Sequence, residues 1–442
     1  MSKSIAAIIL TMTALLASTI AAANPKIQNW TTANGARVYF VPSPELPMVD
    51  IRVVFDAGSA RDGTQSGLAQ ITNGLLDQGA GDLNADQIAD RMEGLGAQLG
   101  TGSYRDMAIV SLRSLTDRSL LDPALNIMAL VIAKPSFPQD AFDRAQKRIL
   151  VALRAQQESP GDIADKAFFA AVYGDHPYAS PSLGTEKSVT ALTRKDAMAF
   201  HKHYYTGKNA IIAIVGAIDR KQAEEIAEQV VGTLPTGEAA ADLPPVKPLA
   251  AAKTEHIDYP SAQTHILMGQ PGITRDDPDY FPLYVGNHIL GGSGLVSRVA
   301  VEVREKRGLA YSAYSYFIPI HAPGPFTAGL QTRNDQADAA LGVLRDTLRD
   351  FIAKGPTADE LSAAKKNITG GFALRLDSNG KIVDNLASIG FYNLPLDYLD
   401  TFNQRVEAVT ADQIRSAFQR RVHPDDMVTV MVGGPETAAA KP

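Results

Sequence analysis

Two residues in the second half of the chain have side chains suited to holding an oxygen atom that gains negative charge. Arg304 and Tyr311 stand seven residues apart in the segment SRVAVEVREKRGLAYSAYSYF. A guanidinium and a phenol are both hydrogen-bond donors, so side by side they could bind a peptide carbonyl or an oxyanion. Taken alone, however, the segment is more typical of a surface arginine and a half-buried tyrosine than of a functional site.

The elements around this pair predict a corner that brings the two side chains together. An apolar stripe at helical spacing predicts a helix with Arg304 in its last turn. The stripe consists of Val296, Val299, Ala300 and Val303. Gly308 lies where a residue with positive φ commonly ends a helix. The residues LAYSAYSYF are typical of a strand, which would carry Tyr311 and place its tyrosines on a partly exposed face.

A segment of the first half, GLAQITNGLLDQGAG (67–81), has the spacing of a zinc-binding helix without the ligands. Gln70, Asn73 and Gly74 are spaced i, i+3, i+4 and share one helical face. Histidine, glutamate and histidine at these positions would bind zinc and activate a water molecule. An amide and a glycine provide neither a strong ligand nor a base.

This helix is expected to persist because of its packing. Three apolar residues should bury it in a core: Ile71, Leu75 and Leu76. Gly74 is expected in the helix interior, where it costs about 1 kcal/mol relative to alanine.

The histidines do not suggest another metal site. Their positions are 176, 201, 203, 256, 265, 288, 321 and 423. His201 and His203 are two residues apart in a helical stretch, so their side chains diverge. The sequence also has no G-x-S-x-G nucleophile motif, and the GGSG at 291–294 is not followed by the GK[ST] of a P-loop.

The start of the chain indicates export. Residues 1–23 have a lysine, a short apolar run and a small-residue cleavage site, which is typical of a cleaved signal peptide and a periplasmic protein. No later segment is long and apolar enough to anchor the chain in a membrane. The formal charge of −6, without a dense basic block, argues against nucleic acid as a partner, and the absence of cysteine excludes disulfides.

The chain divides into two similar halves of the α+β class. A stretch rich in proline and alanine, 232–255, reads as a linker between domains at 24–231 and 256–436. The halves repeat a pattern of amphipathic helix, IAK tripeptide, proline break and basic helix at 121–154 and 337–375, which indicates internal duplication. Alternating apolar residues predict strands at four segments: 49–58, 108–115, 264–272 and 326–332.

The chain resembles the M16 zinc peptidases, which include the mitochondrial processing peptidase, the bc1 core proteins and bacterial two-subunit enzymes. The resemblance covers residues 30–435 and rests on NGARVYFVPSPELPMVDIRVVFDAGSARDG, VYGDHPYASPSLGTEKSVTALT, YYTGKNAIIAIVGAID and the Arg/Tyr segment. It implies two duplicated α+β domains that form half of a clam-shell chamber. The family's H-x-x-E-H motif falls on Gln70, Asn73 and Gly74, and its third zinc ligand on Val151, so no metal or other cofactor is expected in this chain.

In two-subunit members one chain carries zinc and the other carries the Arg/Tyr pair. The resemblance therefore implies a non-catalytic subunit, inactive alone, that pairs with a zinc-bearing M16 subunit. Arg304 and Tyr311 would then hold the carbonyl of an unfolded peptide and stabilise the transition state. The chief alternative is an inert peptide-binding or scaffold homodimer of the same fold. An independent enzyme with a relocated metal site is a third hypothesis.

Overall fold

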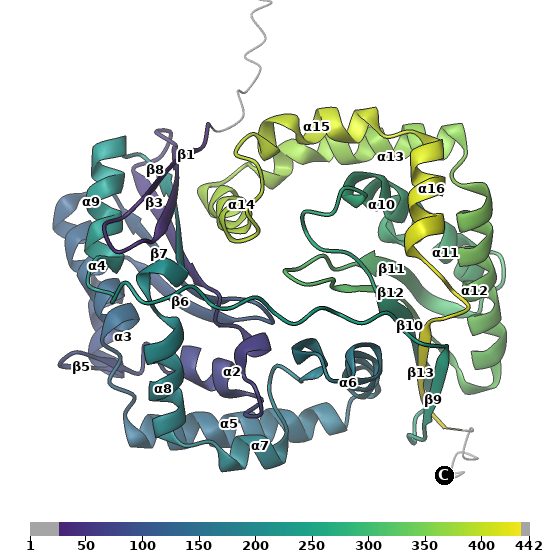
Figure 1. Ribbon diagram of the computed structural model, residues 1–442, viewed down its shortest axis with the longest axis horizontal. Coiled ribbons are helices and arrows are strands. Elements are labelled where there is room, and N and C mark those ends of the chain that lie inside the picture. Colours follow the sequence, from purple (N-terminus) through teal and green to yellow (C-terminus); the bar gives the residue numbers. More distant parts are fainter. Residues whose placement is uncertain (1–25, 435–442) are drawn as a thin grey trace, which may run out of the picture.

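The computed structural model describes residues 26–434, which form two halves that lie side by side around the middle of the molecule (Figure 1). Each half consists of a β-sheet and the helices packed on it. The predicted signal peptide and residues 435–436 of the predicted second domain lie outside the described residues. Within 26–434, no helix has the length and apolar character needed to cross a bilayer.

The first half is built on a six-stranded sheet with the order β1-β2-β8-β3-β7-β6. Its strands are β1 (Gln28–Thr31), β2 (Arg37–Pro42), β3 (Met48–Phe55), β6 (Gln98–Ser103), β7 (Ala108–Leu115) and β8 (Ala210–Gly216). Strands β2 and β8 are parallel and every other pair is antiparallel. The alternating segments at 49–58 and 108–115 form β3 and β7, as predicted.

The second half repeats this topology in a five-stranded sheet with the order β11-β12-β10-β13-β9. Its strands are β9 (Lys253–Ile257), β10 (Gln263–Pro271), β11 (Ala310–Phe317), β12 (Pro325–Arg333) and β13 (Val428–Val432). Strands β9 and β13 are parallel, like β2 and β8, and the remaining pairs are antiparallel. Because strand order and direction match, the predicted α+β duplication is confirmed.

Helices cover both sheets. Those of the first half are α2 (Leu68–Asn73), α3 (Ala85–Gly94), α4 (Arg118–Ala133), α5 (Gln139–Gln157), α6 (Pro160–Tyr173), α7 (Glu186–Ala191), α8 (Arg194–Tyr204) and α9 (Arg220–Val231). Those of the second are α10 (Tyr280–Asn287), α11 (Arg298–Ala300), α12 (Ala337–Lys354), α13 (Ala358–Gly371), α14 (Asn379–Phe391), α15 (Tyr398–Ala408) and α16 (Ala411–Arg421). In each half a long helix pair follows the β6–β7 or β11–β12 hairpin.

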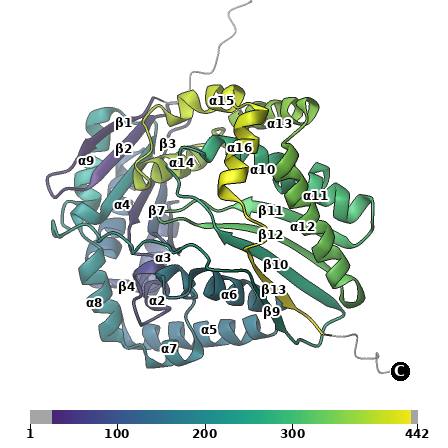
Figure 2. The same ribbon diagram turned by 45° about the vertical axis from the view of Figure 1, so that its right-hand side comes forward.

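One helix of each half packs on the sheet of the other half (Figures 1 and 2). Helix α6 contacts β10 and β13, where Phe168 and Val172 share a buried cluster with Val430 and Val432. Helix α14 contacts β8, β3 and β2 of the first sheet. Exposing such side chains costs about 1.5–3 kcal/mol each, so the two halves are held as one body.

A buried polar contact joins the halves at the β11–β12 hairpin. The carboxylate of Asp106 accepts hydrogen bonds from the Tyr178 hydroxyl at 2.7 Å and the His321 backbone N–H at 2.8 Å. The Ala322 backbone N–H donates to the same Tyr178 oxygen at 3.0 Å. Asp106 and Tyr178 are buried, and each of these polar atoms is paired, as a buried polar group requires.

The segment predicted as a linker is pinned to the surface. Residues 232–252 have neither helix nor strand, but residues 253–255 already belong to β9. The backbone oxygen of Ala241 accepts a hydrogen bond from Arg61 at 2.6 Å. Leu243, Val246 and Leu249 pack against the cluster that contains α6. The segment therefore has no helix or strand up to residue 252 and is partly packed against the protein.

We predict that two Gly→Ala changes in helices will have opposite effects on stability. A Cβ at Gly390, in α14, would lie 2.6 Å from Tyr39 and 2.7 Å from Ile211 of the first sheet, whereas at Gly342 of α12 it would meet nothing within 4 Å. Gly390→Ala should lower the free energy of unfolding by about 1–3 kcal/mol, and Gly342→Ala should raise it by about 0.5–1 kcal/mol. Urea unfolding measures both, and unchanged stability of Gly390→Ala would contradict the close docking of α14.

Candidate functional site

Arg304 lies in a π-helical turn, η6 (Val301–Glu305), that continues α11. π-helical turns are rare and are frequent at functional sites. Val299, Ala300 and Val303 are buried as the stripe predicts, but Val296 is 79% exposed, so that part of the prediction is wrong. The reason is the cap, because Ser297 is extended, its hydroxyl accepts from the Ala300 N–H, and the helix begins only at residue 298.

Tyr311 lies on β11, the edge strand of the second sheet, at an irregularity of the pairing. Ala310 pairs with Thr332 and Ser312 with Gln331, so Tyr311 is an extra residue between two adjacent partners. Such a bulge turns a side chain out of the regular alternation. The Tyr311 side chain is 82% exposed. The turn before the strand has Gly308 at a φ of +61°, as the sequence predicts.

The helix–turn–strand corner brings Arg304 and Tyr311 together. The Arg304 Cζ lies 5.0 Å from the centre of the Tyr311 ring, so the guanidinium rests over the ring face. A cation–π contact at this distance favours one position of the guanidinium. The corner therefore presents a charged donor and a phenolic hydroxyl at an exposed point of the second half.

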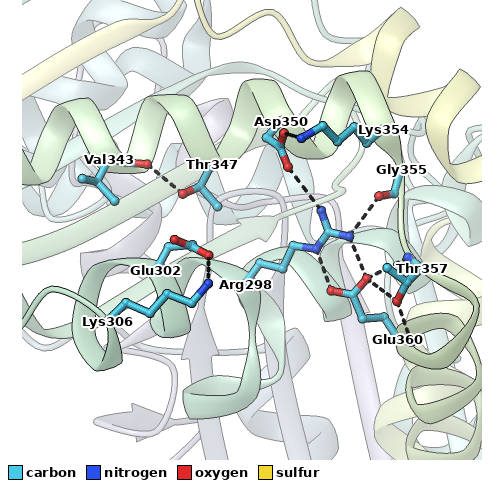
Figure 3. Close-up of polar contacts among 10 residues, drawn as sticks. All are labelled: Arg298, Glu302, Lys306, Val343, Thr347, Asp350, Lys354, Gly355, Thr357 and Glu360. Carbon is cyan, nitrogen blue, oxygen red and sulfur yellow. Dashed lines mark hydrogen bonds and ion pairs between the residues drawn. The ribbon is translucent and has the colours of Figure 1, made fainter.

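An ion-pair network holds the helix that carries Arg304 (Figure 3). The Arg298 guanidinium donates twice to the Glu360 carboxylate at 2.6 Å and once to the Gly355 backbone oxygen at 3.0 Å. Glu360 also accepts from the Thr357 N–H in a capping box at the start of α13. The sequence analysis missed this network. The T-x-x-E spacing marks the capping box, but nothing in the sequence pairs it with Arg298.

The predicted zinc-type helix is α2, and a buried carboxylate holds its start. Asp62 accepts from the backbone N–H groups of Gly67 and Ala69, each at 2.7 Å. Burial raises the pKa of Asp62 to about 7. The prediction that Gly74 lies inside the helix is wrong, because α2 ends at Asn73 and Gly74 is its C-terminal cap. The helix-propensity cost expected for Gly74 therefore does not apply.

Packing preserves α2, as predicted. The three apolar residues Ile71, Leu75 and Leu76 are at most 1% exposed. Asn73 is also buried, and its Nδ2 lies 3.3 Å from both the Ile109 backbone oxygen and the Tyr205 hydroxyl. At the position that the resemblance assigns to a catalytic glutamate, the chain thus has an amide that pairs with buried oxygens in the core.

The four positions that the resemblance assigns to the family's zinc site do not fit a zinc ion. Gln70 is a poor ligand, and neither Gly74 nor Val151 has a side-chain donor atom. Val151 lies on α5, which packs against α2, and its side chain is 64% exposed. Throughout 26–434, no group of three or more His, Cys, Asp or Glu side chains could hold a metal ion. No step of a reaction can be assigned to a metal bound here.

His176 and His201 each form a hydrogen bond with a backbone oxygen of the fold. His176 Nε2 lies 2.9 Å from the Pro244 oxygen, in the predicted linker, and its Nδ1 accepts from the Tyr178 N–H. His201 Nε2 lies 2.8 Å from the Ile132 oxygen. Burial lowers the pKa of both histidines and so favours the neutral rings.

Comparison with known proteins identifies the class to which this fold belongs. Residues 37–186 match the model of the insulinase family, peptidase family M16, and residues 191–368 match the model of the M16 inactive domain. A crystal structure of a peptidase M16 inactive domain from Pseudomonas fluorescens is 42% identical, with a TM-score of 0.90 over 94% of this chain and 100% of that one. The duplicated halves and the zinc-type helix without ligands agree with an M16 protein of the inactive type.

The chain belongs to the M16 peptidase family. More distant relatives extend over most of both sequences. An uncharacterized zinc protease of Streptomyces coelicolor is 27% identical over 88% of this chain and 86% of its own length. The non-peptidase homolog YmxG of Helicobacter pylori is 25% identical over 88% and 89%.

We predict that Asn73 supports stability. Asn73→Ala removes the donor that faces two buried oxygens and should lower the free energy of unfolding by about 1–3 kcal/mol. Gln70→Ala is the matched control on the same helix, because Gln70 is partly exposed, and it should change stability by less than about 0.5 kcal/mol. Urea unfolding tests the pair, and equal effects would show that Asn73 has no special role in the core.

We also predict a pH dependence that comes from Glu360. The hydrogen bond from Arg298 lowers the pKa of Glu360 from its ordinary value of 4.5 to about 2. A carboxylate with a lowered pKa stabilises the fold fully above its unfolded pKa, and this contribution is lost as the pH falls from 4.5 to 2. Glu360→Gln keeps a residue that suits the capping box but removes the carboxylate that titrates. The free energy of unfolding of this variant should therefore fall less than that of the wild type between pH 4.5 and pH 2.

The control for this prediction is Glu186→Gln, on the exposed surface of α7, which removes one carboxylate without touching Arg298. Thermal unfolding measured from pH 5 to pH 2 compares the three proteins. A stability loss in the Glu360→Gln variant as steep as in the wild type would contradict the role of the Arg298–Glu360 pair.

Proposed function

We propose that this chain is the non-catalytic subunit of an exported M16 peptidase and works with a zinc-bearing M16 subunit. One observation carries the proposal: Arg304, which is partly exposed, and Tyr311, which is 82% exposed, form a pair in a chain whose positions for the family's zinc site cannot bind zinc. The pair would have little use in an isolated chain of this kind. In a complex of two such chains it could complete the partner's site. The signal-like segment 1–23 supports export to the periplasm.

The two side chains would act on the carbonyl of the peptide bond that is cleaved. Zinc and the water molecule that attacks would belong to the partner subunit. Arg304 and Tyr311 would donate hydrogen bonds to the carbonyl oxygen and hold it more strongly as it becomes an oxyanion. The cation–π contact helps because it fixes the guanidinium before substrate binds. The substrate would be an unfolded peptide that reaches the edge strand β11.

Exposed apolar residues around the pair support a contact surface there. Leu295 and Val296 lie in η5 (Gly294–Val296), directly before the Arg304 helix, and are 55% and 79% exposed. Segment η5 contacts β11, which carries Tyr311. Large apolar side chains that stay exposed next to one another are typical of surfaces that meet another molecule. A zinc-bearing subunit or the peptide itself would cover them.

We predict that the purified chain does not cleave peptides alone and increases cleavage when mixed with a zinc-bearing M16 homologue of the same organism. In the mixture, Arg304→Ala and Tyr311→Phe should each lower kcat by about 10²–10³-fold. Tyr311→Phe keeps the ring under the guanidinium, so it isolates the hydroxyl. The control is Arg144→Ala on the exposed face of α5, where activity should stay unchanged.

Complex formation is measured separately, by size-exclusion chromatography of each mixture. A complex that forms with Arg304→Ala but has full activity would contradict the proposed role of the pair. No complex and no cleavage with any zinc-bearing homologue would favour the scaffold homodimer. Chelator-sensitive cleavage by the chain alone would favour an independent metal site.

A further inference from the structure

A pocket at the other end of β11 from Tyr311 has a different chemistry from the Arg304–Tyr311 corner. Its volume is about 340 Å³, and it is formed by α10, the end of β11 and the segment after α13. Its lining combines aromatic rings with two arginines. The residues that matter here are Arg275, Tyr280, Tyr284, His288, Tyr316 and Arg375. Tyr316 stands five residues after Tyr311 on the same strand, so the pocket and the corner share β11.

The two arginines are held by tyrosines. Arg275 Nη1 donates to the Tyr280 hydroxyl at 2.8 Å, and Arg375 Nη2 donates to the Tyr284 hydroxyl at 2.8 Å. The Tyr280 and Tyr284 rings are stacked with their centres 5.9 Å apart. Two guanidiniums are therefore fixed on neighbouring rings. Arg275 is the deeper of the two, because its Nε is buried and has no hydrogen-bond partner among the described residues, whereas Arg375 is exposed at the surface.

Neither arginine forms an ion pair within the described chain. The carboxylates nearest in sequence are engaged elsewhere. The Asp276 carboxylate accepts a hydrogen bond from Thr274. Asp277 forms an ion pair with Arg421, and Asp279 forms one with Arg420. Asp377 forms an ion pair with Lys381. Burial and the positive charge of Arg375 also lower the pKa of His288. The pocket thus has a net positive charge that no side chain of the described residues neutralises.

We propose that this pocket binds a carboxylate group of the peptide, and that it sets a preference for acidic substrates. The inference rests on the proposed function, because that function makes a peptide the ligand beside β11. A carboxylate fits because guanidiniums bind it with charge-assisted and often bidentate hydrogen bonds. Arg275 lines the pocket and Arg375 is exposed at its surface, so both guanidiniums border the space that a carboxylate would occupy. The carboxylate can come from the C-terminus of the peptide or from an aspartate or glutamate side chain.

The pocket differs in the sign of its charge from the chain as a whole. A net charge of −6 favours basic peptides only as an average over the whole surface. Salt screens charges more than about 10 Å away, so the two arginines dominate the potential inside the pocket.

The test measures peptide binding to the full chain by isothermal titration calorimetry. One neutral peptide sequence is used in three forms: with a free C-terminal carboxylate, with a C-terminal amide, and as the amide with one glutamine replaced by glutamate. We expect the carboxylate forms to bind about 10-fold more tightly than the neutral amide. Tighter binding of the free-acid form alone assigns the C-terminus as the source, and tighter binding of the glutamate form assigns a side chain.

Arg275→Gln and Arg375→Gln should each abolish this preference. Arg375→Gln changes an exposed side chain, so it keeps the test valid if Arg275→Gln does not fold. Arg144→Gln, which removes an equal charge on α5, should leave the preference intact. Equal binding of all three peptides to the wild type, or a preference that persists in both pocket variants, would overturn the inference.

The pocket and the proposed function can fail independently. If Arg304→Ala does not slow the mixed enzyme but carboxylate peptides still bind more tightly, the proposed role of the pair fails and the pocket stands. If Arg304→Ala slows cleavage while the peptides bind equally, the pocket is wrong and the proposed function stands.

Discussion

The exchange of helices between the two sheets is the constraint on which the rest of the structure depends. Each sheet buries one face under a helix that belongs to the other half, α6 on the second sheet and α14 on the first. Neither half therefore has a complete core of its own. The buried hydrogen bonds of Asp106 add a specific polar contact at the same junction. Domain motion between the halves would have to break both, so the corner that carries Arg304 has a fixed position relative to the first half.

The two halves share a strand topology but differ in their local structure at α2 and at the Arg304–Tyr311 segment. In the first half, α2 is packed into the core and has none of the side chains that zinc chemistry needs at the positions that the resemblance assigns to a zinc site. Asn73 is the clearest case, since its amide now pairs with the core where a catalytic carboxylate would stand. In the second half, the local backbone is irregular where the chemistry is expected, with a π-helical turn at Arg304 and a bulge at Tyr311. The core constrains the first segment, whereas Tyr311 in the second is exposed to solvent.

Periodicity predicted much of the fold, because burial on one face leaves a pattern in the sequence. Alternation gave β3, β7, β10 and β12, and the repeated order of segments predicted the duplication. The two wrong predictions, for Val296 and Gly74, both concern helix ends, where the local cap decides which residue begins or ends the helix. Ser297 caps the helix after Val296, and α2 ends before Gly74. The pair Arg298–Glu360, the helix exchange and the pocket beside α10 all join residues far apart in sequence. A single sequence carries no periodic signal for such contacts, so they become visible only in the folded chain.

The proposed function requires that Arg304 and Tyr311 stabilise a transition state in a partner's site. The most direct measurement is the affinity of a phosphinic transition-state analogue and of an uncleaved substrate-like peptide for the mixed complex, with wild-type and Tyr311→Phe chains. We expect the analogue to bind about 100-fold more weakly to the complex with the variant, while the peptide binds equally well to both. An analogue that binds both complexes with the same affinity would contradict it.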